Sequence, residues 1–233
     1  MQMLAYYYVL IFFIYSVAGW VMETTFKSIQ QKRWANRGFL LGPIIPIYGV
    51  GMVLLTLILQ QYADDPLVVI ILSVVICGVL EYLTSWIMEK LFRARWWDYS
   101  NFKFNINGRV CLGNLVLFGL GGWLAISFAN PFLFSIFEEM PNLAVTIITI
   151  SLLIAFLVDI LMSFKIIMSL RRETKKFDLT DNTEEITWRV RKMLMEKSAI
   201  YRRLAKAFPG LKVQPRRRKK GTKKSKDKTT LIG

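Results

Sequence analysis

Five apolar runs, each of about 20 residues, occupy most of the first 164 positions of this sequence. An α-helix rises about 1.5 Å per residue, so a run of this length can cross the ~30 Å hydrocarbon core of a bilayer. Lipid offers no hydrogen-bond partners to an exposed backbone, and such a segment therefore has to be helical. The runs are residues 3–22, 42–61, 67–88, 111–129 and 143–164. They predict an all-α integral membrane protein with five transmembrane helices.

The distribution of basic residues predicts how these helices are oriented. Lys and Arg number zero before the first run, then four, zero, five and zero between successive runs, and 22 after the last. The whole net charge of +15 therefore falls beyond residue 164. Because basic residues concentrate in cytoplasmic loops, this alternation predicts an N-terminus outside the cell and a C-terminus in the cytoplasm.

The second run has an unusual beginning. Gly42-Pro43-Ile44-Ile45-Pro46-Ile47-Tyr48-Gly49 contains two prolines and two glycines. Proline lacks a backbone N–H and clashes with the preceding turn, so irregular or kinked first turns are predicted here. Non-helical backbone at membrane depth requires burial in protein or contact with water. The alternative is an ordinary loop followed by a helix that a proline initiates.

Several classes of site are excluded by composition. The sequence contains no histidine, which rules out Ser-His-Asp and Cys-His catalysis. Its two cysteines, Cys77 and Cys111, are far apart and form no CxxC pair, so neither a zinc site nor a disulfide scaffold is predicted. We expect no metal and no cofactor.

Polar side chains concentrate between Glu81 and Arg109. Glu81, Ser85 and Glu89 are spaced four apart and share one side of the third helix. A carboxylate in the middle of a membrane helix costs roughly 2.5–3.5 kcal/mol, so Glu81 is expected to have a partner or a function. The loop that follows supplies arginines, tryptophans, asparagines, Asp98 and Tyr99 as possible partners.

The predicted topology brings further polar residues to the same cytoplasmic depth. Arg37, Arg95 and Arg109 flank the N-terminal ends of the second and fourth helices, which predicts a cytoplasm-facing cavity for an anionic or amphiphilic solute. Glu23 and Glu89, at helix C-termini, are expected to pair with these arginines. Alternatively, the same contacts simply hold the helices together, and the tryptophans form an interfacial belt. The candidate ligand-binding or coupling residues are Glu23, Asn36, Arg37, Glu81, Glu89, Arg95, Trp96, Trp97, Asp98, Asn105, Arg109, Asn114 and Asp159.

Three regions are predicted: a transmembrane domain at residues 1–170, an amphipathic helical segment at 171–210 and a basic tail at 211–233. Within the middle region, residues 183–208 place apolar side chains on one side of a helix. The tail has almost no large apolar residues, so disorder is expected. Attraction to anionic inner-leaflet lipid, about 1 kcal/mol per basic residue, is favoured over nucleic-acid binding as its role.

Several motifs between residues 11 and 125 also resemble those of a known family. They are Tyr15-Ser16, Gly19-Trp20, Glu23, Asn36-Arg37-Gly38-Phe39-Leu40, Gly42-Pro43, Pro46-Ile47-Tyr48-Gly49, Leu80-Glu81-Tyr82-Leu83-Thr84-Ser85-Trp86, Glu89-Lys90-Leu91-Phe92, Arg95-Trp96-Trp97-Asp98-Tyr99-Ser100, Phe104-Asn105 and Gly108-Arg109. In these residues the sequence resembles the bacterial integral membrane proteins labelled putative ABC-transporter type IV. The resemblance implies a multi-pass protein of the bacterial cytoplasmic membrane with a permease role.

Three functions compete. In the first, the chain is a transporter subunit in which Glu81 and Asp159 act in coupling or gating. The sequence has no GxxxxGK[ST] phosphate loop, so a separate ATPase subunit is expected, and five spans favour a homo-oligomer. In the second, it is a membrane enzyme acting on a phosphate-bearing lipid or isoprenoid, with Glu81 or Glu23 as general base and the arginines as a phosphate clamp. In the third, it is a non-catalytic scaffold.

Overall fold

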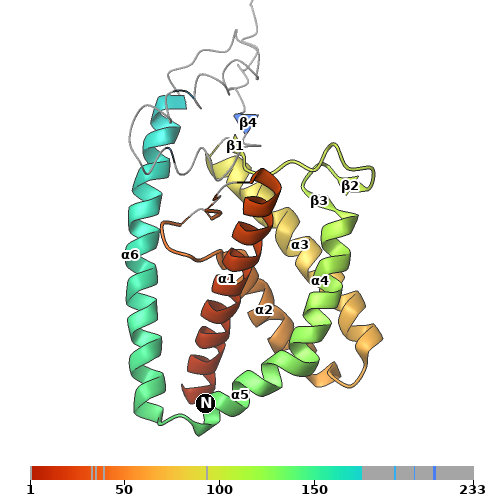
Figure 1. Cartoon of the computed structure of the whole chain (residues 1–233), viewed down its shortest axis with the longest axis vertical. Helices are drawn as coiled ribbons and strands as arrows, with labels where there is room; N and C mark the ends of the chain where they lie inside the picture. Colours follow the sequence, from red (N-terminus) through yellow and green to blue (C-terminus); the bar gives the residue numbers. More distant parts are fainter. Residues whose placement is uncertain are drawn as a thin grey trace, which may run out of the picture.

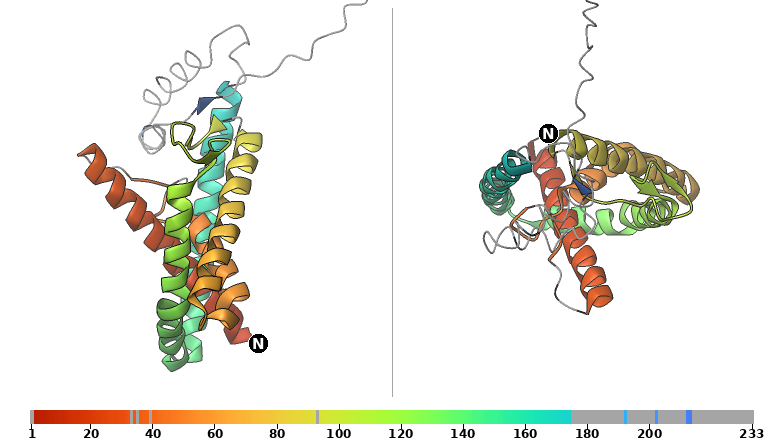
Figure 2. Two further views of the ribbon diagram at one scale, coloured as in Figure 1. Left: turned by 90° about the vertical axis from the view of Figure 1, so that its right-hand side faces the viewer. Right: turned by 90° about the horizontal axis from the view of Figure 1, so that it is seen from above.

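The computed structural model describes residues 2–32, 34, 36–38, 40–92, 94–174, 192, 202 and 212–213. These residues form a helical bundle with a few very short strands (Figure 1 and Figure 2). The helices are α1 (Gln2–Gln31), α2 (Pro46–Leu59), the 3-10 turn η1 (Gln60–Tyr62), α3 (Pro66–Phe92), α4 (Leu112–Leu124), the π-helical segment η2 (Ala125–Ala129), α5 (Asn130–Glu139) and α6 (Asn142–Thr174). The strands are β1 (Ala94–Arg95), β2 (Asn105–Ile106), β3 (Val110–Cys111) and β4 (Lys212–Val213).

Two ends of the bundle differ in charge. Helices α1, α3 and α6 end, and α4 begins, at the upper end in Figure 1. We call this the basic end, because the loops predicted to be basic lie here. The opposite end, where α2 meets α3 and α5 meets α6, carries Asp64, Asp65, Glu138 and Glu139, and we call it the acidic end.

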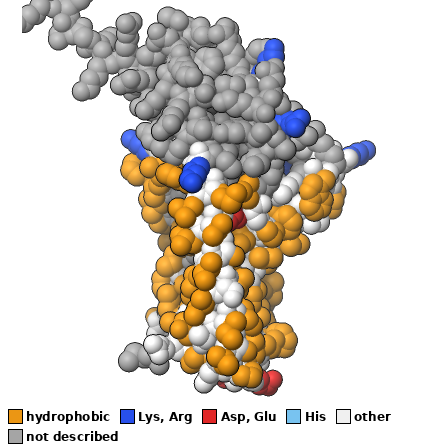
Figure 3. Space-filling view, turned by 90° about the vertical axis from the view of Figure 1, so that its left-hand side faces the viewer, with side chains coloured by type: hydrophobic (Ala, Val, Ile, Leu, Met, Phe, Trp, Pro, Cys, Tyr) orange, Lys and Arg blue, Asp and Glu red, His pale blue; other side chains and the backbone are white. Residues whose placement is uncertain are grey.

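Four helical segments are long and apolar enough to cross a membrane: Gln2–Gln31, Pro66–Phe92, Leu112–Glu139 and Asn142–Lys165. The segment Pro46–Tyr62 is apolar but shorter. Large apolar side chains lie exposed along the bundle, and Figure 3 shows them covering its body while Lys and Arg side chains gather toward one end. An apolar surface of this extent is typical of a protein that lies in lipid. The predicted all-α membrane class is confirmed.

The second predicted run begins with non-helical residues and a helix that a proline initiates, which is one of the two predicted alternatives. Residues 42–45 are not helical, and α2 starts only at Pro46, which occupies the first helical position. The cause is local: Ile45 precedes a proline and is held extended, with φ of −117°. Its N–H donates to the carbonyl oxygen of Ser16 in α1, 3.0 Å away. The irregular segment at residues 40–45 therefore lies beside the middle of α1, and we call it the broken segment.

The fourth predicted run extends further than expected. We predicted a helix ending at Ala129 and a loop over residues 130–142, but the chain continues through η2 into α5 and turns only at Met140. Pro131 would clash with the preceding turn of a regular α-helix. The π-helical turn of η2 widens the helix just before it, which lets the helix continue past the proline.

Asn130, predicted to lie in that loop, is instead completely buried. Its Oδ1 accepts a hydrogen bond from the Tyr15 hydroxyl at 2.7 Å, and its Nδ2 donates to Thr56 Oγ1 at 2.8 Å. One amide thus joins α5 to α1 and α2. In an apolar environment such a contact both satisfies the buried groups and fixes how the helices align.

The C-terminal predictions fall largely on undescribed residues. Of the predicted amphipathic helix at 183–208, the structure describes only Lys192 and Arg202. Of the tail at 211–233, it describes only Lys212 and Val213, which form β4 and pair antiparallel with β1.

Glycines allow close helix packing between α3 and α4. A Cβ atom on Gly122 would overlap Ser73, whose side chain is completely buried, and would crowd Leu55. A Cβ atom on the neighbouring Gly121 would meet no atom within 4 Å. Small residues at such contacts let helix backbones approach closely in lipid.

Replacing Gly122 by alanine is therefore expected to lower stability, by about 1–3 kcal/mol, because the added methyl group overpacks the α3–α4 contact. Gly121→Ala is the matched control, since it changes the same helix by the same group and enters open space. The two variants are compared by their melting temperatures in mild detergent. Equal melting temperatures would contradict the packing described here.

Candidate functional site

The candidate site is a group of polar side chains near the basic end, drawn from α1, α2, α3, α4, α6 and the loops between them. We call it the polar layer. Its members are Glu23, Arg37, Tyr48, Glu81, Glu89, Arg95, Asp98, Tyr99, Arg109, Asn114 and Asp159. The contacts divide them into four groups rather than the single pocket that the sequence suggested.

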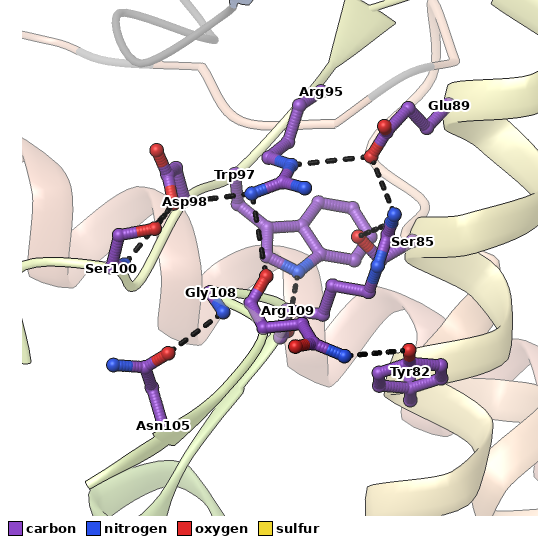
Figure 4. A network of polar contacts seen from close by, with 11 residues as sticks. Tyr82, Ser85, Glu89, Arg95, Trp97, Asp98, Ser100, Asn105, Gly108 and Arg109 are labelled. Carbon is purple, nitrogen blue, oxygen red and sulfur yellow. Dashed lines mark hydrogen bonds and ion pairs between the residues drawn. The ribbon is translucent and has the colours of Figure 1, made fainter.

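The first group is an ion network between the end of α3 and the loop that follows it (Figure 4). Glu89 Oε2 accepts from Arg109 Nη2 at 2.8 Å and from Arg95 Nε at 3.2 Å. Arg95 Nη1 also lies 3.6 Å from Asp98 Oδ1, and Arg109 Nη1 donates to Ser85 Oγ at 3.2 Å. The expected pairing of Glu89 with arginines is confirmed.

A tight hairpin holds Arg109 in this network. Strands β2 and β3 pair antiparallel, and the turn between them contains Asn107 and Gly108, with φ of 52° and 66°. Positive φ at both central residues is characteristic of a type I′ turn, for which Asn-Gly is the preferred sequence. The N–H of Arg109 closes the turn on the carbonyl of Ile106 at 3.0 Å. The Asn-Gly pair in the sequence was the signal for this hairpin, and we did not predict it.

Other candidate residues in this loop support its shape. Asn105 Oδ1 accepts from the N–H of Gly108 at 2.7 Å, and its Nδ2 donates to the carbonyl of Phe102. The Trp97 indole N–H donates to the carbonyl of Arg109 at 3.0 Å. Trp96 is buried and its ring packs edge-on against Phe92. Asn105, Trp96 and Trp97 therefore act by positioning the ion network.

The second group surrounds Glu81, whose side chain is buried in α3 with 6% exposed. Its Oε1 accepts from the Tyr99 hydroxyl at 3.3 Å and from Asn114 Nδ2 at 3.2 Å. Asn114 Nδ2 also lies 2.8 Å from the Tyr99 oxygen, which closes a triangle of three side chains. Within the described residues, the buried Oε2 of Glu81 has no hydrogen-bond partner.

Tyr99 lies in the loop outside the long helices; it was among the possible partners of Glu81 in the sequence but not among the candidate site residues. Burial raises the pKa of its phenol well above the usual range, and the neighbouring carboxyl of Glu81 raises this pKa further. Tyr99 therefore stays protonated at any physiological pH and donates its hydrogen to Glu81.

The third group links α1 to the start of α2. Glu23 Oε2 lies 3.4 Å from Arg37 Nε, which confirms the pairing expected for this acid. Its Oε1 accepts from the Tyr48 hydroxyl at 3.0 Å. Asn36, another predicted site residue, accepts from the indole N–H of Trp20 at 2.9 Å. Tyr48 was not among the predicted site residues, although it lies within residues 42–49, where irregular first turns were predicted.

The fourth group serves the broken segment. Asp159 of α6 accepts the backbone N–H groups of Leu41 and Gly42, each at 2.8 Å, and the Ser163 hydroxyl at 3.0 Å. These two N–H groups have no helical partner, and lipid would leave them unsatisfied. Asp159 is therefore a structural anchor for the broken segment. The described residues hold no group of three or more His, Cys, Asp or Glu side chains suited to a metal ion.

Asp159→Asn is expected to destabilise the protein by about 1.5–3 kcal/mol, because one charged acceptor of a backbone N–H is lost. The broken segment should also become more accessible to protease added at the basic end. Asp64→Asn, an exposed change at the acidic end, is the control and should leave both readouts unchanged. Melting temperature and cleavage rate in reconstituted vesicles check this. An unchanged cleavage rate in Asp159→Asn would refute the anchoring role.

Comparison with known proteins adds one match. The model of the family described as putative ABC-transporter type IV matches residues 10–164, which extends beyond the 11–125 expected from the motifs and contains every member of the polar layer. No curated protein and no solved structure matches the chain. The family match covers well over half of the sequence. This membrane protein therefore belongs to the putative ABC-transporter type IV family.

Proposed function

We propose that this chain is the permease-like subunit of a transporter in the bacterial cytoplasmic membrane, and that it handles an amphiphilic solute at the polar layer. The family supports a role in transport. The exposed apolar surface of the bundle supports its place in a membrane. The position and contacts of the broken segment carry the rest of the proposal.

The proposed topology has five crossings, with the N-terminus outside and the C-terminus in the cytoplasm. Helices α1 and α3 run in the same direction in Figure 1, so the chain between them has to return through the bundle. Helix α2, with 14 residues or about 21 Å, is too short to do so alone, and the broken segment supplies the remaining length. The basic loops then all lie on the cytoplasmic side, as the positive-inside rule requires.

The broken segment is the observation that favours transport. Non-helical backbone at membrane depth is tolerated where protein buries it or where it lines a watery path. Transporters commonly bind their solutes where non-helical backbone meets a helix end inside the membrane. Here the non-helical stretch ends where α2 begins at Pro46. Tyr48, two residues further along the chain, contacts Glu23 of α1. We place the solute between this point and the Glu81 group.

Charge in the polar layer favours an amphiphilic solute over an anion. Arg95 and Arg109 both contact Glu89, and Arg37 contacts Glu23. Each arginine is thus already compensated by a carboxylate, which weakens its attraction for phosphate. The same pairing argues against the lipid-phosphate enzyme, whose clamp needs uncompensated cations. Because long apolar helix faces lie open to lipid, an amphiphile can approach from the bilayer.

A transporter of this kind needs an energy source, and an ATPase subunit is the partner we propose. Full-length tagged protein is purified from its native membrane in mild detergent, and co-purifying proteins and lipids are identified by mass spectrometry. We expect a stoichiometric ATPase with a phosphate loop, whose ATP hydrolysis responds to the co-purified amphiphile.

Two variants sharpen this test. Tyr48→Phe is expected to lower the apparent affinity for the amphiphile about tenfold, equivalent to about 1.4 kcal/mol, while the ATPase remains bound. Tyr62→Phe removes the same hydroxyl from an exposed position at the acidic end and serves as the control. Absence of any ATPase would contradict the proposal. Full function in Tyr48→Phe would argue instead for a scaffold.

A further inference from the structure

The Glu81 carboxyl group is buried, and it has no cationic partner among the residues that the structure describes. Within the described part of the chain, its hydrogen bonds come from a phenol and an amide, both neutral, and reach only Oε1. Two described arginines of the following loop, Arg95 and Arg109, pair with Glu89 instead. Oε2 is buried and receives no hydrogen bond from the described residues. Glu23 and Glu89 pair with arginines and Asp159 accepts backbone N–H groups, but within the described residues this oxygen of Glu81 does neither.

An ionised carboxylate in this position would be costly. Burying a charge that is not paired is far more expensive than burying a neutral polar group, and a buried group of this kind usually neutralises instead. In a membrane helix, the cost of burying an unpaired charge adds to the cost of inserting the residue into the bilayer. A hydrogen atom on Oε2 removes the charge and leaves the two hydrogen bonds to Oε1 in place.

We propose that Glu81 is a proton-binding site, which holds a proton on Oε2 in this structure and exchanges it reversibly with water. The proposal goes beyond transport and does not depend on the proposed function, because it concerns the protonation of one side chain.

The surroundings support both the bound and the released state. Among the described residues, the groups that interact with Glu81 are neutral or acidic: Glu23 from α1, Tyr48 from α2, Cys77 from α3 itself, Asn114 from α4 and Tyr99 from the loop. Acids nearby favour proton binding, since a second negative charge repels the first. Tyr99 and Asn114 donate hydrogen bonds that stabilise the carboxylate once the proton leaves. Tyr99 is partly exposed, so it connects the buried carboxyl to the surface loop.

Infrared spectroscopy of the full chain in phosphatidylcholine vesicles tests this directly. A protonated carboxylic acid has a C=O stretching band that an ionised carboxylate lacks. We expect this band at neutral pH in the wild type, its loss in Glu81→Gln, and its retention in the control Glu138→Gln, which changes an exposed acid at the acidic end. We also expect the band to disappear as the pH is raised while the protein stays folded.

Two results would overturn the proposal. One is a spectrum in which Glu81→Gln and the wild type have the same band, or in which neither has one, because Glu81 is then ionised. The other is a band that persists at every pH at which the protein remains folded, because the proton is then permanent rather than bound reversibly.

A second measurement uses only the wild-type protein, so it does not depend on whether a variant folds. Dicyclohexylcarbodiimide adds to a protonated carboxyl group in an apolar environment: the proton moves to one nitrogen, the carboxyl oxygen bonds to the central carbon, and the acyl group then shifts to nitrogen. Nothing is released, and mass spectrometry locates the adduct. We expect the adduct on Glu81 of the wild type and not on Glu23 or Glu89, with less adduct at higher pH. Sodium ions that abolish the label at constant pH would identify a cation site and overturn the proposal.

Discussion

The rest of the bundle depends on one requirement, that a non-helical stretch of backbone inside an apolar protein still has to find hydrogen-bond partners. The broken segment meets it with the carboxylate of Asp159 and the carbonyl of Ser16. These two contacts tie the start of α2 to both α6 and α1. From composition alone, Asp159 is a candidate for chemistry, because it is a charged residue in a membrane helix. In the structure it is needed as the hydrogen-bond acceptor for the backbone of the broken segment.

The acids of the polar layer therefore differ in role despite their similar depth. Glu89 compensates two arginines and fixes the loop, Glu23 joins α1 to α2, and Asp159 anchors the broken segment. Glu81 has neutral partners among the described residues. An acid that is neither paired with a cation nor used by the backbone is the one whose charge can change at the least structural cost.

Much of this architecture could be predicted from the sequence, because apolar runs of membrane length leave few alternatives to a helix. The exact ends of the helices were harder to predict at prolines. Pro46 begins a helix where the apolar pattern had started earlier, whereas Pro131 lies within a continuing helix because η2 widens the turn before it. The ion pair of Glu89 followed from its place near the end of α3, whereas Glu23 pairs with Arg37 from inside α1, which continues to Gln31. The triangle of Glu81, Tyr99 and Asn114 could not be predicted, because it depends on how a surface loop folds back over α3 and α4.

The pairing of β4 with β1 has a mechanical consequence. Lys212 aligns with Arg95, and the Arg95 side chain is bound to Glu89 near the end of α3. A force applied to β4 is therefore transmitted through two short links, a strand pair and an ion pair, to the helix that carries Glu81. The most basic part of the sequence follows directly after β4. Attraction of this basic part to lipid or to a protein would therefore act on α3. That helix carries Glu81, the only described acid of the polar layer with no cationic or backbone partner.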